Sequence, residues 1–155
     1  VIDGKQFSFE KSFALQTVSP DTQILLFDDV EKNFPFENLF SLITEGITIE
    51  KKNKDAIKIP VSKSPKIIIT TNYTIGGLGG SFERRKHEVE FSSYFNAQHT
   101  PLDEFGQMLF DEWNEIEWIK FDNFMIDCVQ KYLSNGLVKS EFKNLQVRKF
   151  IKETF

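Results

Sequence analysis

The stretch Gln23-Ile24-Leu25-Leu26-Phe27-Asp28-Asp29 decides the fold of this chain. Four consecutive apolar residues that end in two acids are typical of a short strand buried on both faces, as in a parallel sheet covered by helices. The stretch Lys66-Ile67-Ile68-Ile69-Thr70-Thr71 has the same form and ends at Asn72. We therefore predict an α/β fold in which both stretches are fully buried, adjacent strands.

The residues between these strands predict a helix and a β-hairpin. Pro35 begins a segment whose apolar residues recur at helical spacing, and the segment ends at Gly46. Those apolar residues are Phe36, Leu39, Phe40 and Ile43. Ile47-Thr48-Ile49 and Ile57-Lys58-Ile59 then alternate apolar and polar residues on either side of a lysine-rich tip, which is typical of a hairpin.

The second half of the sequence predicts mainly helices. A long helix is expected to end at Asn135-Gly136, because the apolar residues before it recur at helical spacing. Those residues are Phe121, Phe124, Met125, Cys128, Val129 and Leu133. Cys128 is therefore expected to be a core residue rather than a nucleophile. Shorter helices are predicted over residues 102–110 and 142–150, and a short strand over residues 88–91.

Charge is distributed unevenly along the chain. The whole sequence has 19 basic and 23 acidic residues, a net charge of −4. Residues 48–66 contain six lysines and two acids, whereas residues 101–127 contain eight acids and one lysine. We expect an α/β domain over residues 1–97 and a helical segment over residues 98–155, with different partners for the two.

Composition argues against several classes of protein. One cysteine is too few for a disulfide framework or a cysteine-based zinc site, and it favours a reducing compartment such as the cytoplasm. No apolar run approaches the roughly 20 residues that a membrane span requires, so no membrane is expected as a partner. His87 and His99 have no second ligand at metal-binding spacing, and we expect both to be ordinary loop histidines.

Polar residues that follow the two predicted strands indicate a nucleotide site. The carboxyl ends of parallel strands meet at the edge where α/β sheets bind ligands. Asp28 is suited to hold Mg²⁺ and Asp29 to orient the attacking water, while the Asn72 amide is suited to hydrogen-bond a γ-phosphate. Arg84 and Arg85 are suited to bind phosphate oxygens, because a guanidinium group is always charged and donates in a fork.

Taken in this order, the segments resemble the ATPase core of superfamily 3 helicases, and above all the primase-helicases of phages and mobile elements. The resemblance comprises residues 24–29, the hairpin with residues 45–52, residues 67–72 and Arg84-Arg85. The order and spacing of these elements are more specific than any one of them. The resemblance implies a partial AAA+-like P-loop ATPase core with parallel strands, flanking helices and a β-hairpin, followed by a helical C-terminal segment.

The resemblance also implies a role for each polar residue in ATP hydrolysis. Asp28 would be the Walker B acid that binds Mg²⁺, Asp29 the second acid beside the catalytic water, and Asn72 the sensor residue. Arg84 or Arg85 would be the arginine finger, which enters the ATP site of a neighbouring subunit in a ring, typically a hexamer. ATP and Mg²⁺ are therefore the implied cofactors.

Single-stranded DNA is the implied partner of the hairpin. Lys51, Lys52 and Lys54 at its tip would contact the phosphates of a strand in the central channel of the ring during DNA replication. The basic character of residues 48–66 favours the same partner independently, because a phosphate backbone is attracted to clustered lysines.

The sequence lacks one element of the family, and two alternatives stay open. It contains no G-x-x-x-x-G-K-[ST] phosphate loop, and the glycine-rich residues 76–81 are not followed by Gly-Lys-Ser/Thr. We expect these residues to be a flexible connector, and the chain to be an inactive fragment of a helicase. One alternative is a metal-dependent nuclease that uses Asp28 with Glu50-Lys51-Lys52. The other is a non-catalytic module that binds DNA through the hairpin and a replication partner through its acidic helical half.

Overall fold

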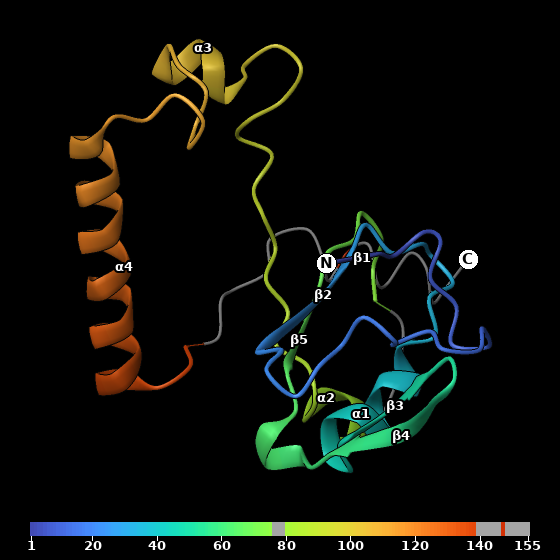
Figure 1. Ribbon diagram of the computed structural model, residues 1–155. Helices are drawn as coiled ribbons and strands as arrows, with labels where there is room; N and C mark the ends of the chain where they lie inside the picture. Colours follow the sequence, from blue (N-terminus) through green and yellow to red (C-terminus); the bar gives the residue numbers. More distant parts are fainter. Residues whose placement is uncertain (76–79, 139–146, 148–155) are drawn as a thin grey trace. The chain divides into compact units, whose positions relative to one another are not determined.

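The computed structural model describes residues 1–75, 80–138 and 147 (Figure 1). The described residues belong to two compact units, which divide between Lys86 and His87. The predicted boundary at residues 97 and 98 lies farther along the chain than this division. Residues 94–97 group with the second unit because Asn96 forms a β-bridge with His99, and the Phe95 ring packs 6.2 Å from that of Phe105.

The first unit is built on a parallel sheet of three strands. β2 (Ile24–Asp28) lies between β1 (Ile2–Asp3) and β5 (Lys66–Ile69), and both pairings are parallel (Figure 1). In the β2–β5 pair, Ile24 lies opposite Lys66 and Phe27 opposite Ile69. The prediction of adjacent strands in a mixed α/β fold is thereby confirmed.

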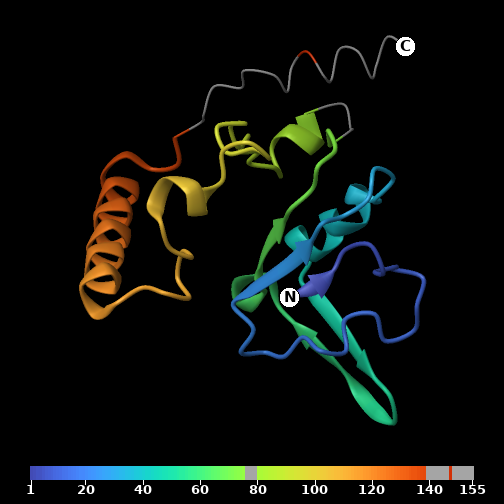
Figure 2. The same cartoon turned by 90° about the horizontal axis from the view of Figure 1, so that it is seen from above.

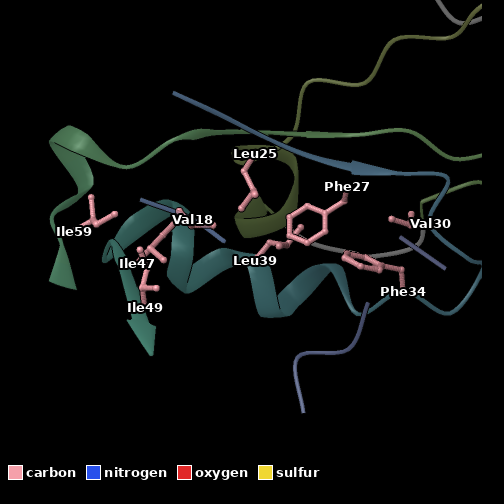
Figure 3. Packing of buried hydrophobic residues seen from close by; sticks show 9 residues of the cluster. All are labelled: Val18, Leu25, Phe27, Val30, Phe34, Leu39, Ile47, Ile49 and Ile59. Atoms are coloured by element: carbon pink, nitrogen blue, oxygen red, sulfur yellow. The ribbon is translucent and has the colours of Figure 1, made fainter. Parts of the chain in front are cut away.

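One face of this sheet carries the hydrophobic core. Leu25 and Phe27 are 4% and 0% exposed, and both point from β2 toward Leu39 (Figure 3). The buried cluster is completed by residues from the loops, the helix and the hairpin. Its members are Val18, Leu25, Phe27, Val30, Phe34, Leu39, Ile47, Ile49 and Ile59.

The opposite face of the sheet is open within the described residues. Ile24 is 58% exposed and Ile68 is 47% exposed, although both are large apolar side chains. The prediction that β2 and β5 are buried on both faces is therefore wrong. The physical reason is that successive side chains of a strand point to opposite faces, and the buried cluster gathers only on the Leu25–Phe27 face.

The predicted helix after Pro35 is present in two parts. The 3₁₀-helix η1 (Phe36–Asn38) leads into α1 (Leu39–Thr44), with Pro35 as the N-cap of η1. Gly46 follows with φ +93°, in the left-handed region that favours glycine, and turns the chain into the next strand. The predicted start and end of the helical segment are confirmed.

The predicted hairpin is formed by β3 (Ile47–Lys51) and β4 (Lys54–Ile59), which pair antiparallel. Its base is anchored because Ile47, Ile49 and Ile59 belong to the buried cluster. The tip, by contrast, extends away from the three-stranded sheet (Figure 2). The 3₁₀-helix η2 (Val61–Lys63) connects the hairpin to β5, and α2 (Gly80–Glu83) follows later in this unit.

The second unit contains α3 (Pro101–Phe105) and α4 (Glu115–Asn135). α3 is shorter than the helix predicted over residues 102–110, because Gly106 ends it with φ +68°. α4 begins with a capping box, in which the Asn114 side chain accepts from the backbone N–H of Glu117 and the Glu117 side chain accepts from that of Asn114. It ends before Gly136 as predicted.

Two other predictions for this unit are wrong. Residues 88–91 do not form a strand, and Phe91 is 91% exposed. Cys128 is half-buried on α4 rather than enclosed in a core, because none of residues 87–138 is fully buried. The helix predicted over residues 142–150 lies, apart from Val147, outside the described residues. Among residues 1–75 and 80–138, no helix combines the length and apolar character needed to cross a membrane.

Candidate functional site

The polar residues predicted to lie together are found at the carboxyl ends of β2 and β5. Beyond the last paired residues, the Thr70 N–H donates to the Phe27 carbonyl, and the Val30 N–H donates to the Thr70 carbonyl, each at 3.0 Å. The two chains therefore stay side by side after the strands end. This continuation keeps Asp28 and Asp29 next to the segment that carries Asn72.

Thr70 links the two strand ends through its hydroxyl group. The hydroxyl donates to Oδ1 of Asp28 at 2.6 Å and accepts from the backbone N–H of Asp29 at 2.7 Å. The Thr71 hydroxyl donates to the Val30 carbonyl at 2.9 Å. The bond from Thr70 fixes the orientation of the Asp28 carboxylate. Asp28 itself is exposed at the end of β2.

Asp29 is the point at which three parts of the chain meet. Its backbone has φ +53°, a left-handed conformation that is uncommon outside glycine and is tolerated best by residues such as Asp and Asn. Asn72 donates from Nδ2 to Oδ1 of Asp29 at 3.3 Å. Lys5, which follows β1, forms an ion pair with Oδ2 of the same carboxylate. The hydrogen bond to Asp29, together with its charge, raises the pKa of Lys5 above its usual value.

Sequence patterns did not single out Lys5 and Thr70 as site residues. Gly4 explains how Lys5 reaches the site, because its backbone N–H donates to the Asp28 carbonyl at 2.7 Å. A Cβ at this position would lie 2.6 Å from that carbonyl oxygen and 2.5 Å from Cγ1 of Val30. The sequence Asp3-Gly4-Lys5 could have indicated a turn that brings Lys5 to the site. The preceding strand has only two residues, however, and is too short to predict from its pattern.

The two arginines lie elsewhere in the first unit. Arg84 donates from Nε to the Gly80 carbonyl at 2.9 Å and is exposed. Arg85 donates from Nη1 to the Ser81 carbonyl at 2.8 Å, and its guanidinium carbon lies 5.1 Å from the centroid of the Phe40 ring. Within the described residues, neither arginine contacts Asp28, Asp29 or Asn72.

The hairpin displays its lysines as predicted. Lys52 and Lys54 are exposed, Lys51 is half-buried, and Asn53 turns the chain with φ +57°. Lys51 and Lys54 lie directly opposite each other in the pairing of β3 with β4. Like charges in this position repel each other, so the tip is a surface on which a bound anion would relieve repulsion. Most of residues 76–81, the expected connector, lie outside the described residues.

A metal ion at the strand ends would have few protein ligands. In the described ranges 1–75 and 80–138, no group of three or more His, Cys, Asp or Glu side chains is arranged to hold a metal. Asp28 and Asp29 offer carboxylate oxygens, the ligand type that Mg²⁺ prefers, and Mg²⁺ is commonly bound by one or two carboxylates together with phosphates and water. The nuclease alternative pairs Asp28 with Glu50, which lies on β3 in the other sheet.

The Asp28–Asp29–Asn72 arrangement, with Thr70 and Lys5, is therefore a polar cluster at the edge of a parallel sheet where ligands bind in α/β folds. Comparisons of this chain with protein-family models, with curated proteins and with solved structures gave no match.

Proposed function

We propose that this chain forms the Walker B, sensor and hairpin part of a superfamily 3 helicase, a partial AAA+-like ATPase core. One observation carries the proposal: Asp28 ends β2, Asn72 follows the adjacent parallel strand β5, and Asn72 hydrogen-bonds to Asp29, the neighbour of Asp28. Antiparallel or separated strands would have placed them at different edges. The resemblance to primase-helicases supplies the substrates, ATP and single-stranded DNA.

In this proposal, residues at the strand ends would bind the metal ion, the attacking water and the γ-phosphate. Asp28 would hold Mg²⁺ with a carboxylate oxygen, and the ion would neutralise charge on the β- and γ-phosphates. The Thr70 hydroxyl keeps the Asp28 carboxylate in one orientation. Asp29 would orient the attacking water, and the Asn72 amide would donate to a γ-phosphate oxygen and accept from that water.

Asp29 has to exchange partners for this chemistry to occur. In the structure its two carboxylate oxygens are engaged by Lys5 and Asn72. Both contacts are solvent-exposed, and water screens an exposed ion pair, so a bound nucleotide would displace them at little cost. Asn72 would then turn from Asp29 to the phosphate.

The hairpin and the arginines would couple hydrolysis to DNA in a ring of subunits. Lys51, Lys52 and Lys54 would bind the phosphates of one strand, and the hairpin base, anchored in the core, would transmit movement between the strand ends and the DNA. The arginines would act on the ATP site of the neighbouring subunit. The sequence contains no phosphate loop. Binding of the nucleotide phosphates would therefore require residues other than Asp28, Asp29 and Asn72.

An ATPase assay on the full-length protein tests the proposal. Asp28→Ala and Asn72→Ala are each expected to lower DNA-stimulated kcat by about 10²–10³-fold, the typical effect of removing a group that acts on the transition state. Asp21→Ala and Asn38→Ala are matched controls, because both residues are exposed and lie away from the strand ends. Hydrolysis that survives both site substitutions, with the controls equally active, would show that the strand ends do not form the site.

A further inference from the structure

A pocket of 360 Å³ lies between the N-terminal loop and the base of the hairpin. Its walls come from residues 9–15 of the loop and from Thr48 and Glu50 of β3. In Figure 2 the loop, drawn in dark blue, passes beside the hairpin. Because Thr48 and Glu50 belong to β3, the pocket adjoins the hairpin that is proposed to bind DNA.

Strand alternation explains why Thr48 and Glu50 form one wall. Ile47 and Ile49 are fully buried, so the residues between and after them point to the opposite, exposed face of β3. Lys58 lies directly opposite Thr48 in the pairing with β4, and directly opposed residues share a face. A lysine from the second strand therefore stands on the same face as the pocket wall.

Two aromatic residues of the N-terminal loop, Phe9 and Phe13, also line the pocket. Phe9 is held in place by Phe7, whose ring centroid lies 4.8 Å away, edge to face, and Phe7 in turn packs on buried Phe27 at 4.9 Å. Phe13 has φ +63°, a conformation that is rare for a bulky residue. Strained backbone of this kind is concentrated at ligand-binding positions. Phe13 is half-buried and lines the pocket.

The polar residues that line the pocket are Glu10, Lys11, Ser12, Thr48 and Glu50, and the Lys11 ammonium donates to the Gln6 carbonyl at 2.7 Å. The two carboxylates come from different segments, Glu10 from the N-terminal loop and Glu50 from β3. Carboxylates accept hydrogen bonds from the exocyclic amino group of cytosine, whereas thymine carries no amino group. Aromatic rings stack on any base, and lysines bind the phosphates on either side of it. The pocket thus offers aromatic residues and hydrogen-bond acceptors to a base, and Lys58 stands on the adjoining face of the hairpin, where it could contact a phosphate.

We propose that this pocket holds one unpaired nucleobase of the DNA strand bound by the hairpin, and that it favours a base with an amino group, such as cytosine, over thymine. The inference rests on the proposed function, because it requires the hairpin to bind single-stranded DNA. It adds a base-binding site to a surface that would otherwise contact only phosphates.

Fluorescence anisotropy with oligodeoxycytidine and oligodeoxythymidine of equal length tests the inference on the whole chain. Phe13→Leu keeps an apolar side chain but removes the aromatic face, and we expect it to weaken binding of both strands about tenfold. Glu50→Gln is expected to narrow the preference for cytosine over thymine, because it removes an acceptor and a charge. Phe91→Leu is the matched control, since Phe91 is 91% exposed and does not line the pocket.

A triple Lys51→Gln, Lys52→Gln, Lys54→Gln variant separates the two hypotheses. If it weakens binding of both oligonucleotides while Phe13→Leu and Glu50→Gln bind like the wild type, the pocket inference is wrong and the DNA-binding hairpin stands. If the wild type binds neither oligonucleotide, or the triple variant binds as the wild type does, both are wrong. Circular dichroism of each variant verifies folding, and exposed Glu50 gives a variant that leaves the core untouched.

Discussion

At the scale of single residues, the sequence predicted the acids and the amide of the candidate site but not what holds them. Asp28, Asp29 and Asn72 follow apolar runs, and that pattern is visible in one dimension. Lys5 and Thr70 act through contacts between strands that are distant in the sequence. Such contacts follow from sheet pairing and register, which local patterns do not specify.

Gly4→Ala tests the close approach of β1 to the site. Its Cβ would meet the Asp28 carbonyl oxygen at 2.6 Å and a Val30 methyl at 2.5 Å. Both neighbours belong to the ordered strand end, so we expect a loss of about 1–3 kcal/mol in the free energy of unfolding, measured by urea denaturation. Gly80→Ala is the control, because a Cβ there meets nothing within 4 Å. Equal stability of the two variants would contradict the close approach.

At the scale of elements, the predictions were correct for elements that form from neighbouring residues. They were wrong where the structure of a segment depends on another segment that packs or pairs with it. The hairpin alternates apolar and polar residues and is closed by its own turn, so its sequence suffices. Residues 88–91 alternate equally well but do not form a strand, because alternation alone does not supply the neighbouring strand that a sheet needs. The prediction that β2 is buried on both faces failed for the same reason. An apolar run indicates a strand, but it does not show whether other elements pack on one face of the sheet or on both.

The short helix α3 gives a prediction about pH. The Thr100 hydroxyl and backbone N–H donate to Asp103, and these bonds hold the pKa of Asp103 below its usual value. A carboxylate with a lowered folded-state pKa stabilises the helix above its unfolded pKa of about 4, and this stabilisation is lost as the pH falls through the folded pKa. We therefore expect hydrogen-exchange protection of α3 to fall in acid.

Asp103→Ala should lower the protection of α3 at neutral pH and differ little from the wild type at a pH below the folded pKa of Asp103. The control is Asp111→Ala, an exposed acid outside the capping box, which should follow the wild type throughout. A difference between Asp103→Ala and the wild type that stays constant with pH would show that the charged form of Asp103 does not stabilise the helix.

At the scale of the whole molecule, the net charge of −4 averages over a lysine-rich hairpin in the first unit and an acidic second unit. All the residues for which we propose a role in ATP hydrolysis or DNA binding lie in the first unit. Both arginines donate to backbone carbonyls, Arg84 to Gly80 and Arg85 to Ser81, but Arg85 is half-buried and also packs against Phe40, whereas Arg84 is exposed. Arg84 is therefore the better candidate for a finger that acts on another subunit.

Mixing two inactive variants of the full-length protein tests this assignment. Arg84→Ala should lower kcat about a thousandfold or more, as loss of an arginine finger does, and Asp28→Ala should abolish hydrolysis at its own site. In a mixed ring, some interfaces join an intact Asp28 to an intact Arg84 from the neighbouring subunit, so activity should partly return. Arg85→Ala should instead lower thermal stability, because it removes the contact with Phe40. A mixture as inactive as its components would show that Arg84 does not act between subunits.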